Sequence, residues 1–242
     1  MKQLKDNLLL INNSHPLSKN YVPCSLVTLS EDHQLTKQAA EKLCALVTTI
    51  DAKEDIVPVS GYRSYEEQSH IYQDSLTKNG KNYTQKYVAK PGCSEHQAGL
   101  AIDVALKQDD IDFICPEFPN HGIARIFREH MAAFGFILRY PEGKTQITGI
   151  AYEPWHFRYV GLPHSQIIEE REFALEEYIA YLRNFTSFYE PFHWQNGDCA
   201  YYIVTVPMDD WFLGKTQVPD KVVICEMSAN NCGELIITYR TD

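Results

Sequence analysis

The stretch Ser94-Glu95-His96-Gln97-Ala98-Gly99-Leu100-Ala101-Ile102-Asp103 is the part of the sequence on which the fold and the site both depend. It places an imidazole and a carboxylate seven positions apart, in a glycine-containing loop that runs into an apolar strand. About fifty residues later, Glu153-Pro154-Trp155-His156 adds a second imidazole and a second carboxylate. Two imidazoles and one carboxylate form the ligand set of a zinc site that keeps one coordination position open.

The cysteines argue against a purely structural metal site. Such a site is normally closed by four protein ligands, often thiolates, and the sequence contains no Cys-x-x-Cys pair. Asp103 lies within an apolar strand, where a carboxylate is costly unless it is paired or bound to a metal. Glu153 is then free to take a proton from water, which indicates hydrolysis. Spacing alone leaves the ordinary interpretations open, in which a histidine packs in the core and a glutamate faces solvent.

Arg63 lies in Ser60-Gly61-Tyr62-Arg63-Ser64, between a predicted strand and the start of a predicted helix. A guanidinium fixed there can donate hydrogen bonds to an oxyanion, although an arginine in a turn more commonly forms a surface ion pair. Ser94, Gln68 and Trp155 are candidate substrate-binding residues. Their ordinary roles would be capping a loop and packing.

The composition is that of an ordinary globular protein, with 44% hydrophobic and 22% charged residues among 242. The net charge of −10 argues against nucleic acid or an anionic membrane as a partner. Residues 8–11 are too short an apolar run for a signal peptide, and no run is long enough to span a membrane. Seven scattered cysteines predict free thiols in a reducing cytoplasm. A homodimer is compatible with the sequence.

Hydrophobic periodicity predicts the secondary structure. A catalytic domain is expected over residues 1–184 and a small β-rich extension over 185–242. Ser64 and Glu67 predict a capping box, and Gly135 is expected to end a helix. Polar loops at 78–92 and 109–120 are expected to form walls or lids of a cleft. Helices are expected at 35–50, 64–76, 124–134 and 165–182, and strands at 8–11, 56–59, 100–106, 136–140, 155–160, 201–206, 222–227 and 234–239.

Together these motifs resemble those of the zinc D-alanyl-D-alanine peptidases. That family includes the vancomycin-resistance D,D-dipeptidases and D,D-carboxypeptidases and some phage endolysins. Its pattern is an arginine within Gly-Tyr-Arg-Ser, then Ser-x-His-x-x-Gly-x-Ala-x-Asp, then Glu-x-x-His. The matching segments are Gly61 to Ser64, Ser94 to Asp103, and Glu153 to His156, in the same order and at the same spacing. The resemblance covers roughly residues 8–161.

The resemblance implies an α+β fold with a central antiparallel sheet flanked by helices. It implies one zinc ion per chain at His96, Asp103 and His156, with Glu153 as general base and Arg63 as transition-state stabiliser. The implied reaction is hydrolysis of the D-Ala-D-Ala dipeptide, of the terminal D-Ala of peptidoglycan pentapeptide precursors, or of both. In a cell this would contribute to glycopeptide resistance, as in the cytoplasmic bifunctional enzymes of the family.

Three other functions stay open at this point. A zinc endopeptidase that cuts another wall-peptide bond would use the same ligands. A serine D,D-peptidase is suggested by Ser75-Leu76-Thr77-Lys78 and Ser228-Ala229-Asn230, but no Lys-Thr-Gly follows. A non-catalytic module that keeps the zinc site would be expected to have lost its general base, whereas Glu153 is present.

Overall fold

The chain forms two compact units in the structure, a computed structural model that describes residues 4–30 and 32–241. One unit contains residues 11–174, and the other combines residues 4–10 with 175–241. No helix within the described residues is long and apolar enough to cross a bilayer. The domain boundary between residues 184 and 185 stays a prediction from sequence.

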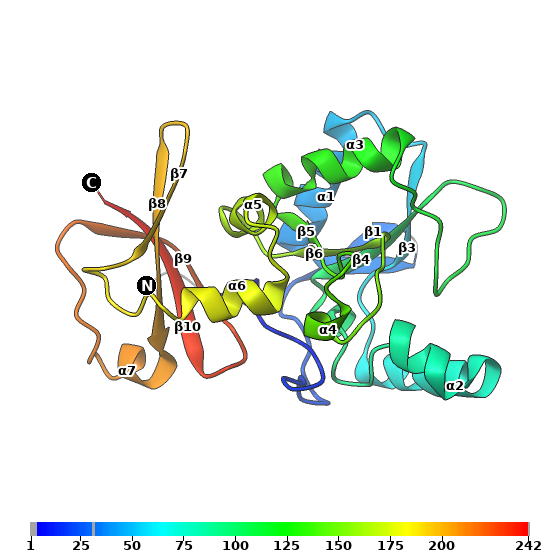
Figure 1. Ribbon diagram of the computed structural model, residues 1–242, viewed down its shortest axis with the longest axis horizontal. Coiled ribbons are helices and arrows are strands. Elements are labelled where there is room, and N and C mark those ends of the chain that lie inside the picture. The colour runs from blue at the N-terminus through cyan, green and yellow to red at the C-terminus, as the bar shows by residue number, and fades with distance from the viewer. Residues whose placement is uncertain (1–3, 31, 242) are drawn as a thin grey trace. The chain divides into compact units, whose positions relative to one another are not determined.

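A four-stranded antiparallel sheet is the centre of the larger unit (Figure 1). Its strand order is β3 (Ile56–Ser60), β4 (Ala101–Leu106), β6 (His156–Tyr159) and β5 (Phe136–Leu138). Helices α1 (Lys37–Thr49) and α3 (Gly122–Met131) lie on one side of this sheet and α2 (Tyr65–Tyr87) on the other. The predicted α+β class is thereby confirmed. The remaining elements of this unit are β1 (Leu26–Ser30), β2 (His33–Thr36), η1 (Glu95–Ala98), η2 (Ala132–Phe134), α4 (Thr145–Thr148) and α5 (His164–Glu170).

Strand β4 is buried along almost its whole length, because helices cover both faces of the sheet. Phe118, Phe127 and Phe157 pack edge to face beneath it, with ring centroids 4.8 to 5.6 Å apart. Pairs of this geometry add to the burial of their apolar area. The register of β4 and β6 places Asp103 directly opposite His156, so the sheet itself joins two of the candidate metal ligands.

Helix α2 begins as predicted and ends later than predicted. Ser64 accepts a hydrogen bond from the Glu67 amide, and the Glu67 side chain accepts one from the Ser64 amide, which confirms the capping box. The helix is interrupted at Gly80, which has a φ of +78°, and then resumes to Tyr87. A buried hydrogen bond between Ser75 Oγ and Thr84 Oγ1 (2.8 Å) spans the interruption. The predicted loop at 78–92 is therefore wrong over its first ten residues.

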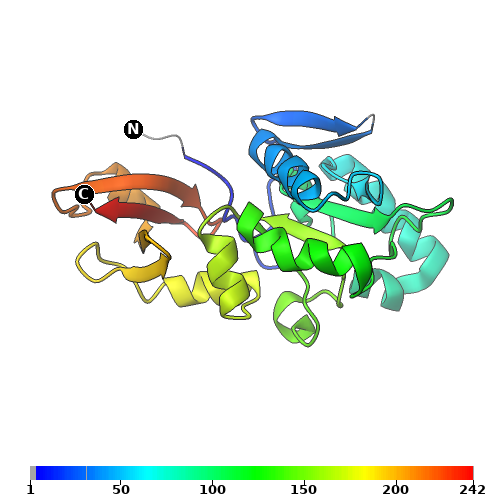
Figure 2. The same ribbon diagram turned by 90° about the horizontal axis from the view of Figure 1, so that it is seen from above.

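The smaller unit is built on a second antiparallel sheet, in the order β7 (Phe192–Asn196), β8 (Cys199–Pro207), β10 (Glu234–Thr241) and β9 (Val222–Ala229) (Figure 2). Helices α6 (Leu175–Leu182) and α7 (Met208–Phe212) complete it. The predicted β-rich extension is confirmed. Strand β7 was missed because it is short and contains no β-branched residue, although Phe192 and Trp194 alternate with polar residues along it.

Two further predictions were wrong. Residues 8–11 are buried but form no strand, since the amides of Leu8 and Leu10 donate to the Ser228 hydroxyl and the Asn230 carbonyl instead of a ladder. The expected helix at 165–182 is two helices, α5 and α6. It breaks near Glu172, whose φ of +52° is incompatible with a continuous α-helix.

Gly135 follows η2 with a φ of +90°, which confirms the predicted helix end. A Cβ at this position would lie 2.6 Å from the Tyr159 ring. We expect Gly135→Ala to lower the free energy of unfolding by the left-handed penalty of about 1 to 2 kcal/mol plus about 1 to 3 kcal/mol of overpacking. Gly143→Ala is the matched control, because Gly143 also has a positive φ (+79°) but open space around it. Equal losses for the two variants in urea unfolding would contradict this account.

His164 is buried at the start of α5, and burial lowers its pKa to about 3. Its unfolded pKa is about 6.5. The stability that it contributes is therefore present above about pH 6.5 and is lost as the pH falls toward 3. We expect His164→Gln to flatten the fall in unfolding free energy between pH 7 and pH 4, by up to about 1.4 kcal/mol per pH unit. The control is His130→Gln, at an exposed histidine, which should keep the wild-type dependence of unfolding free energy on pH. The same dependence in wild type, His164→Gln and His130→Gln would refute the role given to His164.

Candidate metal centre and active site

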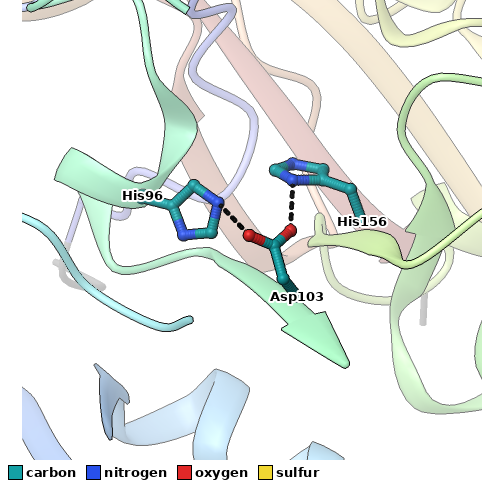
Figure 3. Close-up of side chains that lie close together, drawn as sticks. All are labelled: His96, Asp103 and His156. Atoms are coloured by element: carbon teal, nitrogen blue, oxygen red, sulfur yellow. Dashed lines mark hydrogen bonds and ion pairs between the residues drawn. The ribbon is translucent and has the colours of Figure 1, made fainter. Parts of the chain in front are cut away.

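The side chains of His96, Asp103 and His156 meet at one buried point (Figure 3). His96 comes from η1, Asp103 from the middle of β4, and His156 from the start of β6. His96 Nε2 lies 3.1 Å from Asp103 Oδ2, and His156 Nδ1 lies 2.8 Å from Asp103 Oδ1. One ligand atom from each residue falls within 4.8 Å of the others. The structure therefore brings the three predicted metal ligands together.

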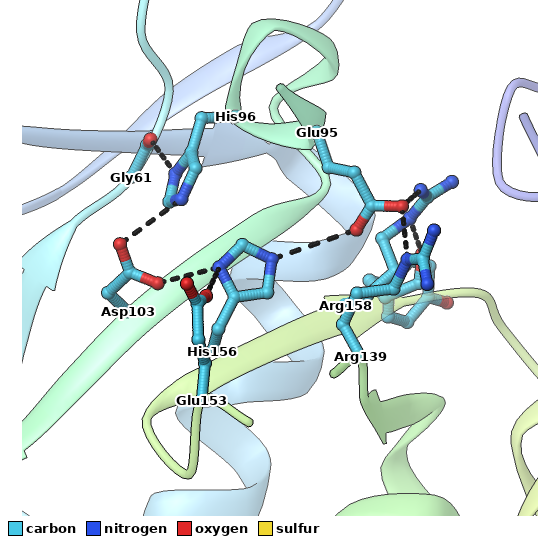
Figure 4. A network of polar contacts seen from close by, with 9 residues as sticks. Gly61, Glu95, His96, Asp103, Arg139, Glu153, His156 and Arg158 are labelled. Atoms are coloured by element: carbon cyan, nitrogen blue, oxygen red, sulfur yellow. Dashed lines mark hydrogen bonds and ion pairs between the residues drawn. The ribbon is translucent and has the colours of Figure 1, made fainter. Parts of the chain in front are cut away.

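The two imidazoles present different nitrogens to this point. His96 donates a hydrogen bond from Nδ1 to the Gly61 carbonyl (2.7 Å), which leaves the lone pair of Nε2 toward Asp103. Gly61 brings its carbonyl there by a close backbone approach, since a Cβ on it would lie 2.5 Å from the Gln34 carbonyl oxygen. His156 instead presents Nδ1 to Asp103, and its Nε2 points away from the centre toward Glu95 (Figure 4).

The arrangement fits a cation. With its proton on Nδ1, His96 turns the lone pair of Nε2 toward a carboxylate oxygen, and within the described residues this buried nitrogen has no hydrogen-bond partner. Two acceptors at such a distance repel each other unless a positive charge lies between them. A tetrahedral zinc site with bonds of about 2.0 Å separates its ligand atoms by about 3.3 Å, close to the distances observed. Two nitrogens and one carboxylate oxygen are a ligand set that zinc commonly takes.

The charges around the centre are strongly coupled. Burial and the nearby Arg63 lower the pKa of His96 to about 4. Burial alone would lower the pKa of His156 as well, but Asp103 raises it to about 9. Burial opposes ionisation of Asp103, yet the two imidazoles hold its pKa well below the usual range. Asp103 is therefore a carboxylate at neutral pH, as metal binding requires.

Glu153 lies beside the ligands and is itself buried, with 5% of its surface exposed. Its Oε2 is 3.8 Å from His156 Nδ1, and burial raises its pKa to about 8. The segment is a turn that leads into β6, as expected from Pro154. Arg128 of α3 fixes this turn by donating to the Pro154 carbonyl (3.0 Å). Glu153 can thus exchange a proton near neutral pH at a fixed position next to the centre.

The centre forms the floor of a pocket with about 480 Å³ of space, part of it open to solvent. Arg63, Gln68, Ser94 and Trp155 all line it, so every candidate residue from the sequence falls at one site. The Nε of Arg63 is buried and has no hydrogen-bond partner within the described residues, and burial lowers the pKa of its guanidinium. The two segments expected as walls contribute Val88, Ala89, Phe113 and Ile114.

The serine-peptidase alternative fails on geometry. Ser75 is buried on α2, with 1% of its surface exposed, and its hydroxyl pairs with Thr84. Lys78 lies at the surface in an ion pair with Asp74 (3.9 Å). A buried and already bonded hydroxyl cannot reach a substrate, so Ser75-x-x-Lys78 is a chance match.

A cluster of buried charges that was not predicted from the sequence lies next to the centre (Figure 4). Glu95 Oε1 accepts hydrogen bonds from Arg139 Nε (2.7 Å) and Arg158 Nη1 (2.6 Å), and all three side chains have 0% of their surface exposed. Burial alone would raise the pKa of Glu95, but the two guanidinium groups hold it well below the usual range. The sequence does hold one sign of this cluster: an arginine lies within the short apolar strand β6 and another directly after β5. An arginine buried at such a position requires an acidic partner.

Comparison with known proteins agrees with this geometry. The family model described as VanY, D-alanyl-D-alanine carboxypeptidase, matches residues 32–162. The chain is 52% identical over 181 residues to the bifunctional D-Ala-D-Ala dipeptidase and D-Ala-D-Ala carboxypeptidase VanXYC of Enterococcus gallinarum. That match covers 73% of this chain and 95% of the relative.

One solved structure of a similar protein extends the match to nearly the whole chain. The structure of the vancomycin-resistance D,D-dipeptidase VanXYg with a D-Ala-D-Ala phosphinate analogue aligns with a TM-score of 0.88 and 40% identity, over 97% of this chain and 94% of that one. VanYB in complex with D-alanine-D-alanine aligns with a TM-score of 0.63 and 32% identity, over 72% and 97%. From the family match and these relatives, the chain belongs to the D-alanyl-D-alanine carboxypeptidase family.

Proposed function

We propose that this protein is a zinc-dependent D,D-peptidase that hydrolyses D-Ala-D-Ala, the terminal D-Ala bond of peptidoglycan pentapeptide precursors, or both. The single observation that carries the proposal is the buried His96–Asp103–His156 group with Glu153 and Arg63 at its side, in one pocket of a chain of this family. Its relative VanXYC is named as a D-Ala-D-Ala dipeptidase and carboxypeptidase, and VanXYg as a vancomycin-resistance D,D-dipeptidase. A contribution to glycopeptide resistance follows by the same reasoning.

One zinc ion per chain would be held by His96 Nε2, His156 Nδ1 and a carboxylate oxygen of Asp103. When bound, zinc would act as a Lewis acid that polarises the scissile carbonyl and lowers the pKa of water. Asp103 compensates part of the cation's charge. The Gly61 carbonyl fixes the tautomer of His96, so that Nε2 is the free ligand nitrogen.

Glu153 is proposed as the general base. It takes a proton as the oxygen of water forms a bond to the carbonyl carbon, and it returns that proton to the leaving amine as the C–N bond breaks. Burial raises the pKa of Glu153 to about 8 and so favours the protonated form. A positive charge at the centre would bring this pKa down, toward the range in which the carboxylate accepts and returns a proton at neutral pH.

Arg63 is proposed to stabilise the oxyanion that forms on the carbonyl oxygen. Its Nε–H is buried in the pocket and unpaired among the described residues, so a donor is available without breaking an existing bond. Desolvation within the pocket strengthens a charge-assisted hydrogen bond of this kind.

Gln68, Ser94 and Trp155 are proposed to bind the substrate. Gln68 donates to the Ala89 carbonyl (2.7 Å), which fixes its amide and leaves a buried Oε1 with no partner among the described residues. This oxygen can accept a hydrogen bond from a substrate N–H. Ser94 offers a hydroxyl at the start of η1, and Trp155 offers an apolar wall.

The cytoplasm is the proposed compartment. All seven cysteines are free thiols, which supports a reducing environment. A homodimer stays compatible with the sequence.

We expect the protein to release D-alanine from D-Ala-D-Ala, from a muramyl pentapeptide, or from both, and to lose this activity with a chelator and regain it with zinc. Glu153→Gln should lower kcat by about 10² to 10⁴-fold, because it removes the general base. It should still bind zinc, as measured by metal content after dialysis. Glu142→Gln, an exposed glutamate nearby in sequence, is the matched control and should keep the wild-type rate.

Two results would contradict the proposal in different ways. No release from either substrate by folded, zinc-loaded protein would exclude the D,D-peptidase. If that protein instead released fragments from intact cell wall, the zinc endopeptidase would replace it. Unchanged activity of Glu153→Gln would exclude the assigned base.

We expect Arg63→Lys to lower kcat by about 10² to 10³-fold, the usual effect of losing an oxyanion donor. Lysine keeps the charge but cannot place a donor at the position of Nε. Arg125→Lys, on the exposed face of α3, controls for the substitution itself. A rise in KM with kcat unchanged would show that Arg63 binds the ground state instead.

A further inference from the structure

We propose that Glu95 is a positioning residue for the second imidazole of the metal centre: its Oε2 accepts a hydrogen bond from Nε2–H of His156 and thereby directs the Nδ1 lone pair toward the metal. This inference rests on the zinc site proposed above. Glu95 occupies the variable position between Ser94 and His96 of the metal-binding motif, and the motif pattern gives it no role.

The geometry of two buried atoms leads to this proposal. Glu95 Oε2 and His156 Nε2 lie 3.7 Å apart, and each is buried without a hydrogen-bond partner among the described residues. Figure 4 shows them facing each other, with the ligand nitrogen of His156 on the opposite side of the ring. A closure of about 0.8 Å gives a normal N–H···O bond. An unmade bond between two buried polar atoms is unfavourable, so a bond between them is stabilising.

The other carboxylate oxygen of Glu95, Oε1, holds the side chain so that Oε2 faces His156. Oε1 already accepts from Arg139 and Arg158, at 2.7 and 2.6 Å. These two bonds immobilise the carboxylate and leave Oε2 as the oxygen that faces His156. Two guanidinium groups close to a metal site would otherwise repel the cation. The carboxylate lies between them and the imidazole and offsets part of that charge.

The same carboxylate connects two ligands. Glu95 is the direct neighbour of His96 on η1, while its side chain reaches His156 on β6. Each imidazole therefore has its own outer partner: a neutral backbone carbonyl for His96 and an anchored carboxylate for His156. A carboxylate partner fixes the tautomer and makes the ring a stronger ligand, and its loss typically lowers metal affinity by about 10 to 100-fold.

Zinc affinity of the full-length chain, measured by competition with a chromogenic chelator, tests the proposal. We expect Glu95→Gln to bind zinc about 10 to 100-fold more weakly than wild type. Arg158→Met is the matched control, because it breaks the same buried cluster but leaves Glu95 bonded to Arg139 and facing His156; its zinc affinity should fall less than about 3-fold, well below the loss of a direct partner. Equal affinity of Glu95→Gln and wild type, or equal losses in both variants, would overturn the proposal.

A second measurement uses only the wild type, so it stands even where a variant does not fold. Long-range ¹H–¹⁵N correlation spectra of the zinc-loaded chain report which ring nitrogen of His156 carries the proton. We expect a slowly exchanging proton on Nε2 and zinc on Nδ1. A proton on Nδ1 would overturn the proposal and leave the proposed peptidase intact. A wild-type protein that binds no zinc would instead overturn the proposed function and this inference together.

Discussion

The pairing of Asp103 with His156 across two antiparallel strands is the constraint on which the site depends. Opposed residues of such a pair have Cβ atoms about 4.5 to 5.5 Å apart, so the sheet register places the carboxylate and the imidazole in contact. A shift of one residue would turn one of them to the other face. Burial of β4 and the aromatic cluster under it oppose such a shift, because the shift would turn apolar side chains away from the core. The precision of the site is thus a property of the sheet.

Because the site lies within the core, several ionisable side chains are buried there. Asp103 and its neighbour Glu153 are buried, as is the cluster that Glu95 forms with Arg139 and Arg158. Isolated charges there would be very costly, and each is compensated by an opposite charge or perturbed in its pKa. Removal of one member leaves its partners uncompensated. The effects of substitutions within this group on the free energy of unfolding should therefore not add.

Sequence predicted the site better than it predicted the chain around it. The candidate ligands, Glu153 and Arg63 were predicted to act together from their residue types and spacing, and the structure places them around one pocket. The helix start at Ser64 and the helix end at Gly135 were predicted correctly because each depends on a few residues that are neighbours in sequence. The break at Glu172 was missed because residues 165–182 contain no glycine or proline to mark it. The strand at 8–11 was wrongly predicted because the amides of Leu8 and Leu10 bond to Ser228 and Asn230, which lie far away in sequence. Glu95 was missed for the same reason, since its partners belong to strands that meet it only in the fold.

The composition of the smaller unit affects the order in which the chain can fold. Lys5 pairs with β9 through the Met227 carbonyl and the Ala229 amide, and the Lys5 ammonium contacts Glu226 at 3.1 Å. Residues 4–10 therefore belong to the same unit as β9 and β10, which are synthesised long after them. The unit of residues 11–174 can form while its neighbour still lacks those strands. Until β9 is synthesised, the amides of Leu8 and Leu10 lack the Ser228 and Asn230 oxygens that accept from them in the folded unit, so this segment is ordered only at the end of synthesis.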